Sequence, residues 1–351
     1  MKAFVIRGKH DAALQDVPAP QTEAGEALVR VRACGVCGSD LHAYLGHQPF
    51  FKYPQIPGHE VVGDIIELRA RPEGLRRLPG RPVEENLQPG DRVVLDPAMP
   101  CGECYPCTHG HYNCCDNMRV VGVHAPGAMA EYYTAPLECL HRVPQQMPDS
   151  LAALVEPVSI GVQANERGRV AHTDTVLVIG AGTIGLCVML VAKSRGAKVV
   201  MSDLSAERLR TASRMGADAV LDPRAGGFRA DLAEVCQTGG PSVVVEAVGT
   251  PATAAQALDL VAASGRVVLL GLISDEIRIP GNILVKKQLD FVGSRLHGGT
   301  IPRAVELLSD RPGAVEGLIT HTVGLGQAEA SLKMMAARPD QVLKVIVAFG
   351  L

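Results

Sequence analysis

The stretch VLVIGAGTIG, residues 176–185, decides the fold of the second half of this chain. Four apolar residues, Val176–Ile179, precede glycines at positions 180, 182 and 185, which have the spacing G-x-G-x-x-G. In a dinucleotide-binding fold the first glycine permits a tight turn, the second lets the backbone approach a pyrophosphate, and the third lets a helix pack closely on the strand. The stretch predicts a strand, a turn and a helix, with these residues at the cofactor: Gly180, Gly182, Thr183, Ile184 and Gly185.

An acidic residue, Asp203, follows Gly185 by eighteen residues, at the end of a second apolar run. A carboxylate at this place accepts hydrogen bonds from the ribose diol of the cofactor and repels a 2′-phosphate. The residue type therefore favours NAD over NADP.

Later apolar runs are separated by segments of helix length, which is the pattern of a parallel sheet with crossover helices. They are Val199–Met201, Ala219–Leu221, Val243–Val245, Val267–Leu270 and Asp290–Val292. Together with Val176–Ile179 they predict a doubly wound parallel sheet. Residues 175–192 carry no charge, but their glycines indicate a strand that turns into a buried helix and not a membrane span.

The first 150 residues have another pattern, in which short alternating runs such as Ala27–Arg32 and Asp91–Leu95 are soon followed by glycine or proline. This pattern predicts a mainly β fold. Near the end, a helix-like stretch, Thr300–Asp310, and a last run, Gln341–Ala348, are too short for a separate core. We expect one domain over 1–155, a dinucleotide-binding domain over 156–293, and a return to the first domain over 294–351.

Composition excludes several classes of protein. The 351 residues include 34 Lys and Arg against 37 Asp and Glu, a net charge of −3, and 47% are hydrophobic. Such a chain supports two domains and lacks the features of a disordered chain or a nucleic-acid-binding arm. The uninterrupted apolar run before Arg7 has only four residues, Ala3–Ile6, too few for a secretory signal, so we expect a cytoplasmic protein that binds neither nucleic acid nor membrane.

Ten cysteines in such a chain indicate thiolate or metal chemistry and not a disulfide framework. Four of them, Cys101, Cys104, Cys107 and Cys115, lie within fifteen residues, among glycines and a proline that provide turns. Four thiolates complete a tetrahedral shell, so a zinc held by them stabilises a loop and takes no part in catalysis. Cys114 is an alternative fourth ligand.

A second group of metal-ligand residue types is dispersed and consists of Cys37, His59 and Glu156. One thiolate, one imidazole and one carboxylate hold zinc while leaving a position for water or a substrate oxygen, as in a catalytic site. Taken singly, His59 and Glu156 are core or surface residues more often than ligands, and the sequence does not show that the three converge.

The segment 69–88 contains five arginines, three glutamates and three prolines without a clear period. Its interspersed charges predict a solvated surface loop. The alternative is a basic patch for an anionic partner.

Five motifs resemble, in order and spacing, the zinc-dependent medium-chain dehydrogenases over nearly the whole chain. They are CGVCGSDLH (34–42), GHE (58–60), the four-cysteine run, VEP (155–157) and GAGTIG (180–185). Glu156-Pro157 and the segment 202–208 look most like the sorbitol and polyol dehydrogenase branch. The segments 46–54 and 113–115 resemble bacterial dehydrogenases of sugar acids such as L-galactonate. The loop 69–88 is longer than is usual in the family.

This resemblance implies a GroES-like β domain that carries the catalytic zinc, joined to a Rossmann domain. It implies that Cys37, His59 and Glu156 surround that zinc, with Glu156 bound directly or through water. Glu60 is expected just behind these three residues, where it can approach the metal, and Asp40 is expected to orient His59. By the same match Cys34 is not a ligand. Tetramers or dimers joined through the edge strand at 290–292 are also expected by analogy.

The resemblance further implies that zinc lowers the pKa of a bound secondary alcohol while hydride leaves its carbinol carbon for NAD. Ser39 is expected to receive the alcohol proton and pass it through the cofactor ribose towards His42. Further cofactor contacts are expected at Arg208, Val248, Gly271, Leu272 and Ser294.

We expect the substrate to be a sugar acid or polyol that is oxidised to a ketone. Three cations, Lys52, Arg119 and Arg295, lie in regions that border the substrate cleft in the family, where a cation pairs with a carboxylate. The alternative for each is a solvated surface position or a contact with cofactor phosphate.

Other interpretations of the sequence name a different substrate or a different class of protein. The substrate alternatives are a sorbitol- or galactitol-like polyol and L-threonine. A non-catalytic zinc- and NAD-binding sensor or assembly subunit would show damage at Cys37, Ser39 or His59, and all three are present. Metal-free quinone reduction would not require Cys37, His59 and Glu156 together.

Overall fold

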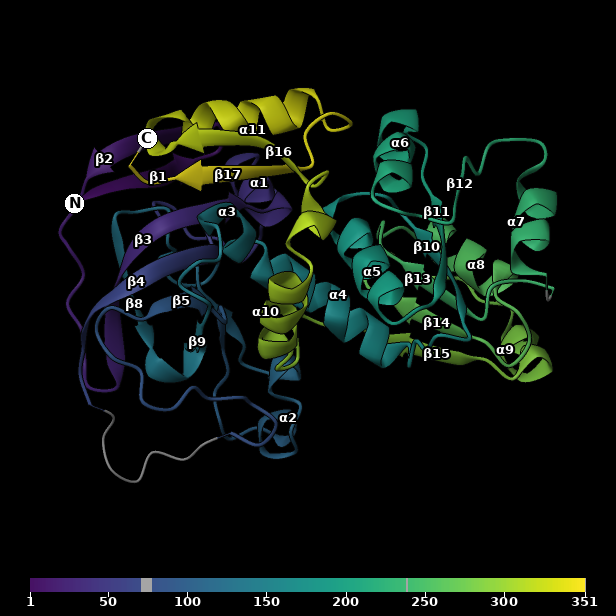
Figure 1. The fold of residues 1–351 in the computed structure, drawn as a ribbon, viewed down its shortest axis with the longest axis horizontal. Helices are drawn as coiled ribbons and strands as arrows, with labels where there is room; N and C mark the ends of the chain where they lie inside the picture. The colour runs from purple at the N-terminus through teal and green to yellow at the C-terminus, as the bar shows by residue number, and fades with distance from the viewer. Residues whose placement is uncertain (71–77, 238, 351) are drawn as a thin grey trace. The chain divides into compact units, whose positions relative to one another are not determined.

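The computed structural model describes residues 1–70, 78–237 and 239–350, and the chain divides into two compact units (Figure 1). Unit 1 comprises Met1–Glu156, Gly298–Pro312 and Ile319–Leu351, and unit 2 comprises Pro157–His297 and Gly313–Leu318. The first boundary falls inside helix α4 (Val155–Arg167). The expected range 294–351 needs two corrections, because residues 294–297 and Gly313–Leu318 belong to unit 2, where Gly317 packs against Met215.

Unit 1 is mainly β. Its largest sheet has the strand order β16-β17-β3-β4-β5-β9, with β8 paired to β3, and two small antiparallel pairs, β1–β2 and β6–β7, accompany it. The strands are β1 (Lys2–Gly8), β2 (Asp11–Asp16), β3 (Glu26–Val36), β4 (Glu60–Leu68), β5 (Arg92–Leu95), β6 (Ala98–Met99), β7 (Arg119–Val120), β8 (Tyr132–Pro136), β9 (Leu140–Arg142), β16 (Ile319–Gly324) and β17 (Lys344–Ala348). The helices are α1 (Gly38–Tyr44), α2 (Tyr105–Thr108), α3 (Asp149–Ala152), α10 (Ile301–Asp310) and α11 (Ala328–Ala337).

The alternation in β3 places one face of this sheet on the core of unit 1. Ala27, Val29 and Val31 are buried, whereas Arg30 is exposed and Arg32 half-buried. The buried side chains pack with others from β1, β4 and β5. The alternating runs of the first half are therefore strands, as predicted.

The last strand, β17, lies beside the strand that leads to Cys37. It pairs antiparallel with β3, with Val345 opposite Val36 and Ile346 opposite Gly35. This pairing brings Lys344, at the start of β17, next to the end of β3.

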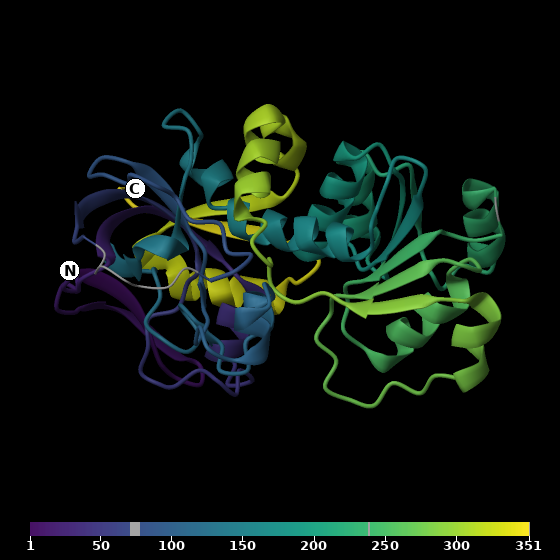
Figure 2. The same ribbon diagram turned by 90° about the horizontal axis from the view of Figure 1, so that it is seen from below.

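Unit 2 is a six-stranded sheet of order β12-β11-β10-β13-β14-β15 in which every pair is parallel. Its strands are β10 (Thr175–Ile179), β11 (Lys198–Ser202), β12 (Ala219–Leu221), β13 (Val243–Glu246), β14 (Arg266–Leu269) and β15 (Asp290–Gly293). Its helices are α5 (Thr183–Ser194), α6 (Ala206–Arg214), α7 (Phe228–Cys236), α8 (Pro251–Leu260) and α9 (Gly281–Lys287). All six predicted strands are present, and helices cover both faces of the sheet (Figure 2).

The strand order reverses between β10 and β13, so the carboxyl ends of these two strands form the switch point where doubly wound sheets bind ligands. The uncharged stretch 175–192 forms β10 and most of α5, as predicted. No helix in the part of the chain that the structure describes is long and apolar enough to cross a membrane.

Candidate active site and metal centres

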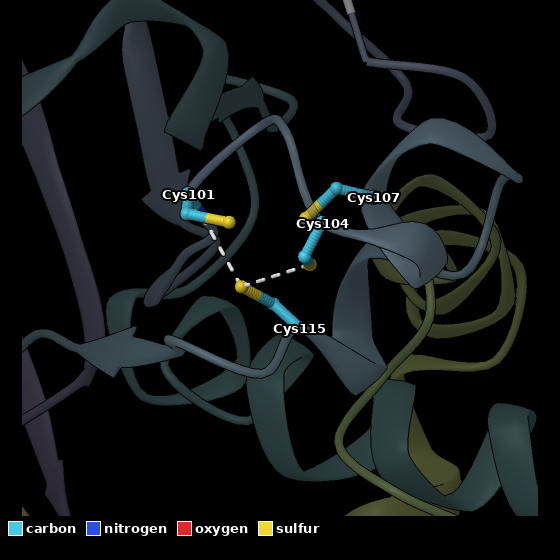
Figure 3. Close-up of side chains that lie close together, drawn as sticks. All are labelled: Cys101, Cys104, Cys107 and Cys115. Carbon is cyan, nitrogen blue, oxygen red and sulfur yellow. Dashed lines mark hydrogen bonds between the residues drawn. The ribbon is translucent and has the colours of Figure 1, made fainter.

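The four cysteines of the run 101–115 converge in unit 1, with their sulfurs facing a common point (Figure 3). The four sulfurs lie within 4.8 Å of one another, and Cys104 Sγ is 3.8 Å from Cys115 Sγ. Cys114, the alternative ligand, is exposed and lies outside this group. Four thiol groups at this separation fit a tetrahedral zinc that has no open position.

Backbone groups of the same segment favour the thiolate form at one of these sulfurs. The N–H groups of Glu103 and Cys104 lower the pKa of Cys101 to about 6. The N–H of Cys101 in turn donates to Cys115 Sγ at 3.2 Å. Burial raises the pKa of Cys107 to about 12. This rise reflects the free-energy cost of a buried thiolate, which a bound cation offsets.

A buried arginine, Arg81, holds this four-cysteine segment against the sheet. Its Nη2 donates to the carbonyl of Ala98 at 2.8 Å and lies 3.1 Å from Asp96 Oδ2. Its guanidinium lies over the ring of Tyr112, 5.1 Å from the centroid, and the Tyr112 hydroxyl donates to Asp96 at 3.1 Å. Tyr112 stands between Cys107 and Cys115 in the sequence, so this contact ties the cysteine segment to β6.

The prediction of a solvated loop at 69–88 is therefore wrong at Arg81, because an ion pair with buried Asp96 compensates its burial. Close backbone packing adds to this anchor: a Cβ on Gly80 would lie 2.6 Å from the Gly110 carbonyl, and one on Gly299 would lie 2.8 Å from the Gly80 carbonyl. Residues 71–77 of the loop lie outside the described residues.

A second group of metal-ligand side chains converges at the end of β3 and the start of β4. Cys37 Sγ, a His59 nitrogen and a Glu60 oxygen lie within 4.8 Å of one another. Burial by itself lowers the pKa of His59, but Cys37 and then Asp40 and Glu156 raise it well above its ordinary value. Such concentrated negative charge around a buried imidazole suits a bound cation.

Asp40 ties the segments that carry Cys37 and His59. Its Oδ2 accepts the backbone N–H of Cys37 at 2.8 Å, and its Oδ1 accepts that of Gly58 at 3.2 Å. The same Oδ1 lies 4.0 Å from His59 Nδ1. Burial raises the pKa of Asp40, and these contacts oppose that shift.

Glu60 forms a buried ion pair with Lys344. Lys344 Nζ lies 2.6 and 2.7 Å from the two carboxylate oxygens and also donates to the Val36 carbonyl at 3.2 Å. A Cβ on Gly35 would lie only 2.1 Å from Glu60 Oε2, so a larger residue there would displace this carboxylate. Glu60 is thus both in the metal-ligand group and paired with a cation.

Ser39 and His42 lie on α1, three residues apart and therefore on one side of the helix. The Ser39 hydroxyl is shielded from solvent and makes no hydrogen bond within the described residues. His42 is exposed. A buried hydroxyl without a partner is one that a substrate hydroxyl can satisfy.

Glu156, the third predicted zinc ligand, is buried near the beginning of α4 and acts electrostatically on His59. It lies outside the group of atoms within 4.8 Å, where Glu60 stands instead. The structure therefore places Glu156 close to the predicted site and Glu60 closer to Cys37.

In unit 2 the predicted cofactor residues gather at the carboxyl edge of the sheet. Gly180 has φ +105° and follows β10, and a Cβ on Gly185 would lie 1.9 Å from the Gly180 carbonyl, so helix α5 approaches as closely as the motif requires. Thr183 and Ile184 begin α5. Asp203 accepts the N–H of Ala181 at 2.7 Å and of Ser205 at 2.8 Å, and Arg208 lies 3.8 Å away.

The other predicted cofactor contacts follow β13, β14 and β15. Val248 is half exposed, Leu272 is almost fully exposed, and a Cβ on Gly271 would lie 2.3 Å from the N of Gly249. The N–H of Ser294 donates to the Leu269 carbonyl at 2.9 Å, and its hydroxyl is buried. These residues line the edge that begins at Gly180.

The three predicted substrate cations have different surroundings. Arg119, on β7, and Lys52 belong to unit 1 and form no ion pair within the described residues. Arg295 belongs to unit 2 and has other interactions. Only Arg119 and Lys52 therefore belong to the unit that carries Cys37 and His59.

Comparisons with known proteins agree with this geometry. Residues 23–145 match the model of the alcohol dehydrogenase GroES-like domain, and residues 183–310 match that of the zinc-binding dehydrogenase. L-Galactonate-5-dehydrogenase of Escherichia coli K12 is 35% identical over 284 residues, which cover 80% of this chain and 78% of the relative. The chain belongs to the zinc-dependent medium-chain alcohol dehydrogenases. It is accordingly an oxidoreductase that acts on a CH–OH group.

Two similar solved structures contain a nicotinamide cofactor. The dehydrogenase RspB of Escherichia coli CFT073, complexed with NADH, has a TM-score of 0.89 and 31% identity over 99% of both chains. A zinc-binding dehydrogenase of Sinorhizobium meliloti 1021, bound to NADP, has a TM-score of 0.88 and 29% identity over 99% of this chain and 98% of its own. Zinc and a nicotinamide cofactor thus belong to the family of this chain.

Three residues of this medium-chain dehydrogenase escaped the sequence analysis: Lys344, Arg81 and Glu246. Buried Glu246 accepts the N–H groups of Val248 and Gly249 at 2.9 and 2.8 Å and thereby shapes the turn after β13. Two of these residues could have been found from the sequence, because each is a single charge beside an apolar run. Lys344 precedes VIVA, and Glu246 follows VVV.

Proposed function

We propose that this dehydrogenase oxidises a secondary alcohol of a sugar acid to a ketone, with NAD as hydride acceptor and a catalytic zinc at Cys37, His59 and Glu156. The observation that supports this most is the convergence of Cys37 and His59 beside a shielded Ser39 hydroxyl that has no partner among the described residues. Zinc, when bound, polarises the alcohol, and NAD takes up the hydride.

The side chains of unit 1 would hold the zinc and move the alcohol proton. Asp40 holds the Cys37 and Gly58 backbones, so both ligand-bearing segments stay in place. Ser39 Oγ would accept the proton of the alcohol while its own hydroxyl proton leaves, and exposed His42, on the same side of α1, would pass that released proton on towards solvent. Glu60, neutralised by Lys344, lies next to Cys37 without adding a net negative charge.

The second zinc would be held by Cys101, Cys104, Cys107 and Cys115, which makes two zinc ions per chain. This zinc maintains the local fold, because its four thiolates leave no position for a substrate. The cysteines are free thiols, which fits a reducing, cytoplasmic location.

Asp203 would select NAD. Its two oxygens are fixed by the N–H groups of Ala181 and Ser205, so the carboxylate cannot swing away from a 2′-phosphate. The complex of RspB with NADH agrees with this choice, whereas the Sinorhizobium relative was crystallised with NADP. Relative rates with the two cofactors distinguish the alternatives.

The sugar-acid substrate is supported by Arg119, three residues before Gly122, which packs against Gly58, and by the similarity to L-galactonate-5-dehydrogenase. Arg119 is an exposed guanidinium without an ion-pair partner in the described part of the chain. A guanidinium binds a carboxylate through two parallel hydrogen bonds. Lys52 and Arg295 are weaker candidates, because an ammonium is a point charge and Arg295 has other interactions.

A substrate screen tests the proposal. NADH formation by the zinc-loaded enzyme is measured with aldonates, the matching alditols, short diols and L-threonine. We expect the highest kcat/KM with an aldonate, and a selective loss for the aldonate in Arg119→Ala, with Arg295→Ala as the comparison. A wild type that prefers the alditol makes a sorbitol-like polyol the better substrate.

We also propose that the enzyme is a homo-oligomer, a dimer or tetramer joined through β15. This strand is one of the two edges of the sheet, and α9, which precedes it, has no buried residue, with Val285 81% exposed. Unpaired edges of this kind are normally covered. The molar mass in solution, for the wild type and for the edge-strand variant Phe291→Asp, tests this arrangement.

A further inference from the structure

Two stacked rings lie at the surface of unit 1 close to the predicted catalytic zinc site. Phe50 is 60% exposed, although it is a large apolar side chain, and its ring stacks on His124 with centroids 5.3 Å apart and planes at 26°. Phe50 belongs to the segment 46–55 after α1, and His124 belongs to the turn after β7. Phe50 is exposed and His124 is half-buried, so the pair presents an apolar ring at the surface next to a polar one.

A side-chain hydrogen bond and close backbone contacts place both segments beside His59. The side-chain amide of Gln55 donates to the Val123 carbonyl at 2.9 Å, and the N–H of Ala128 donates to the Gly58 carbonyl at 2.9 Å. A Cβ on Gly122 would lie 2.6 Å from the Gly58 carbonyl oxygen. The turn that carries His124 is thus packed on the residue that precedes His59.

The hydrogen bonding of His124 leaves one donor directed away from the backbone. The N–H of Val120 donates to His124 Nδ1 at 3.1 Å, so the ring proton is on Nε2. Nε2 makes no hydrogen bond with the residues that the structure describes. Burial, and then the charge of Arg119, lower the pKa of His124, so the ring is neutral at neutral pH.

A polyhydroxylated carbon chain has the matching chemistry. Its C–H groups pack on an aromatic face, and its hydroxyl oxygens accept hydrogen bonds from a ring N–H. Arg119, five residues before His124, adds a cation for a terminal carboxylate.

We propose that Phe50 and His124 bind the carbon chain of the substrate beyond the reacting carbinol, with Phe50 beneath its C–H groups and His124 Nε2 donating to a hydroxyl. This inference rests on the proposed function and adds two residues that determine the substrate class. Both side chains favour substrates whose carbon chain is longer than that of a simple secondary alcohol.

The test compares substrates of different length in matched variants. Phe50→Leu and His124→Gln are assayed with a six-carbon aldonate, its alditol and 2,3-butanediol, and KM is replaced by an inhibition constant where turnover is slow. We expect KM for both six-carbon substrates to rise about 3- to 10-fold, with kcat within about twofold, because one stacking contact or one hydrogen bond is lost in each variant. We expect KM for 2,3-butanediol to stay unchanged.

A control uses another exposed aromatic–histidine stack of unit 1. Tyr105, 73% exposed, stacks on His109 at 4.1 Å in the four-cysteine segment. Tyr105→Leu leaves all the kinetic constants unchanged if the effect is specific to the Phe50–His124 pair. Zinc content and melting temperature confirm that each variant is folded.

Two results overturn the inference while leaving the dehydrogenase function intact. One is an equal loss of kcat/KM for 2,3-butanediol and for the six-carbon substrates in Phe50→Leu and His124→Gln. The other is a wild type that oxidises the short diol but no six-carbon substrate. A zinc-loaded wild type that forms NADH from none of these alcohols overturns the proposed function itself, and this inference with it.

Discussion

Lys344 Nζ lies 2.6 and 2.7 Å from the two carboxylate oxygens of Glu60, and both side chains are buried. The two residues are 284 positions apart, so the last strand of the chain supplies the charge that neutralises a carboxylate of the metal-ligand group. Loss of one partner leaves a buried charge without compensation.

Lys344→Met is therefore expected to reduce the free energy of unfolding by about 3–5 kcal/mol. The double variant Lys344→Met/Glu60→Gln regains most of this loss, because no net charge stays buried. Urea unfolding of the zinc-loaded enzyme measures both. Equal stability of the single and double variants would show that the pair contributes little.

Loss of the catalytic zinc site and loss of the four-cysteine site are expected to affect activity and melting temperature differently. Cys37→Ala abolishes NADH formation with little change in melting temperature, because the fold does not depend on a complete ligand set at the catalytic zinc. Cys104→Ala chiefly lowers the melting temperature, since it frees a loop. Zinc content, calorimetry and activity are measured together, and equal losses in both variants contradict the assignment.

The cofactor preference is expected to depend on Asp203. Asp203→Ala weakens NAD binding and relieves repulsion of NADP. The preference for NAD over NADP is expected to narrow by about 1–3 kcal/mol, the contribution of a hydrogen bond to a charged group. The ratio of kcat/KM for the two cofactors measures this. A wild type that reduces both equally well at subsaturating concentrations removes the role given to Asp203.

Arg81 is expected to stabilise the four-cysteine segment. Arg81→Met leaves Asp96 without its cation and reduces stability by about 3 kcal/mol, with faster release of zinc from the four cysteines. Arg69→Met is the control: Arg69 is in the same loop, is 59% exposed and lies 3.5 Å from exposed Glu67, so its removal changes stability by less than about 1 kcal/mol. Equal effects of both substitutions would contradict this role of Arg81.

The pH dependence of stability is expected to include His124. Its pKa is lowered in the folded state by burial and then by Arg119, so the unfolded chain takes up this proton at a higher pH than the folded one. The contribution of neutral His124 is therefore present above the unfolded pKa of about 6.5 and is lost as the pH falls from there towards the folded pKa. Between pH of about 7.5 and about 5.5, on either side of that unfolded pKa, the melting temperature of the wild type falls more than that of His124→Gln. Parallel curves contradict the assignment.

The sequence by itself determined the features that depend on short-range spacing. The apolar runs of unit 2 predicted all six strands, because parallel strands buried on both faces are continuously apolar. The glycines of 180–185 and the cysteines of 101–115 each lie within fifteen residues, so the turn and the four-thiol group are properties of one segment.

Only the tertiary structure decided which distant residues meet. Cys37, Glu60 and Lys344 come together because β17 pairs with β3 in one register, and a shift of one residue would turn Lys344 to the other face. The choice of Cys115 over Cys114 and the burial of Arg81 against Asp96 follow in the same way from packing. Periodicity shows which side chains are buried, whereas partners far along the chain are set by the register and contacts of the folded sheet.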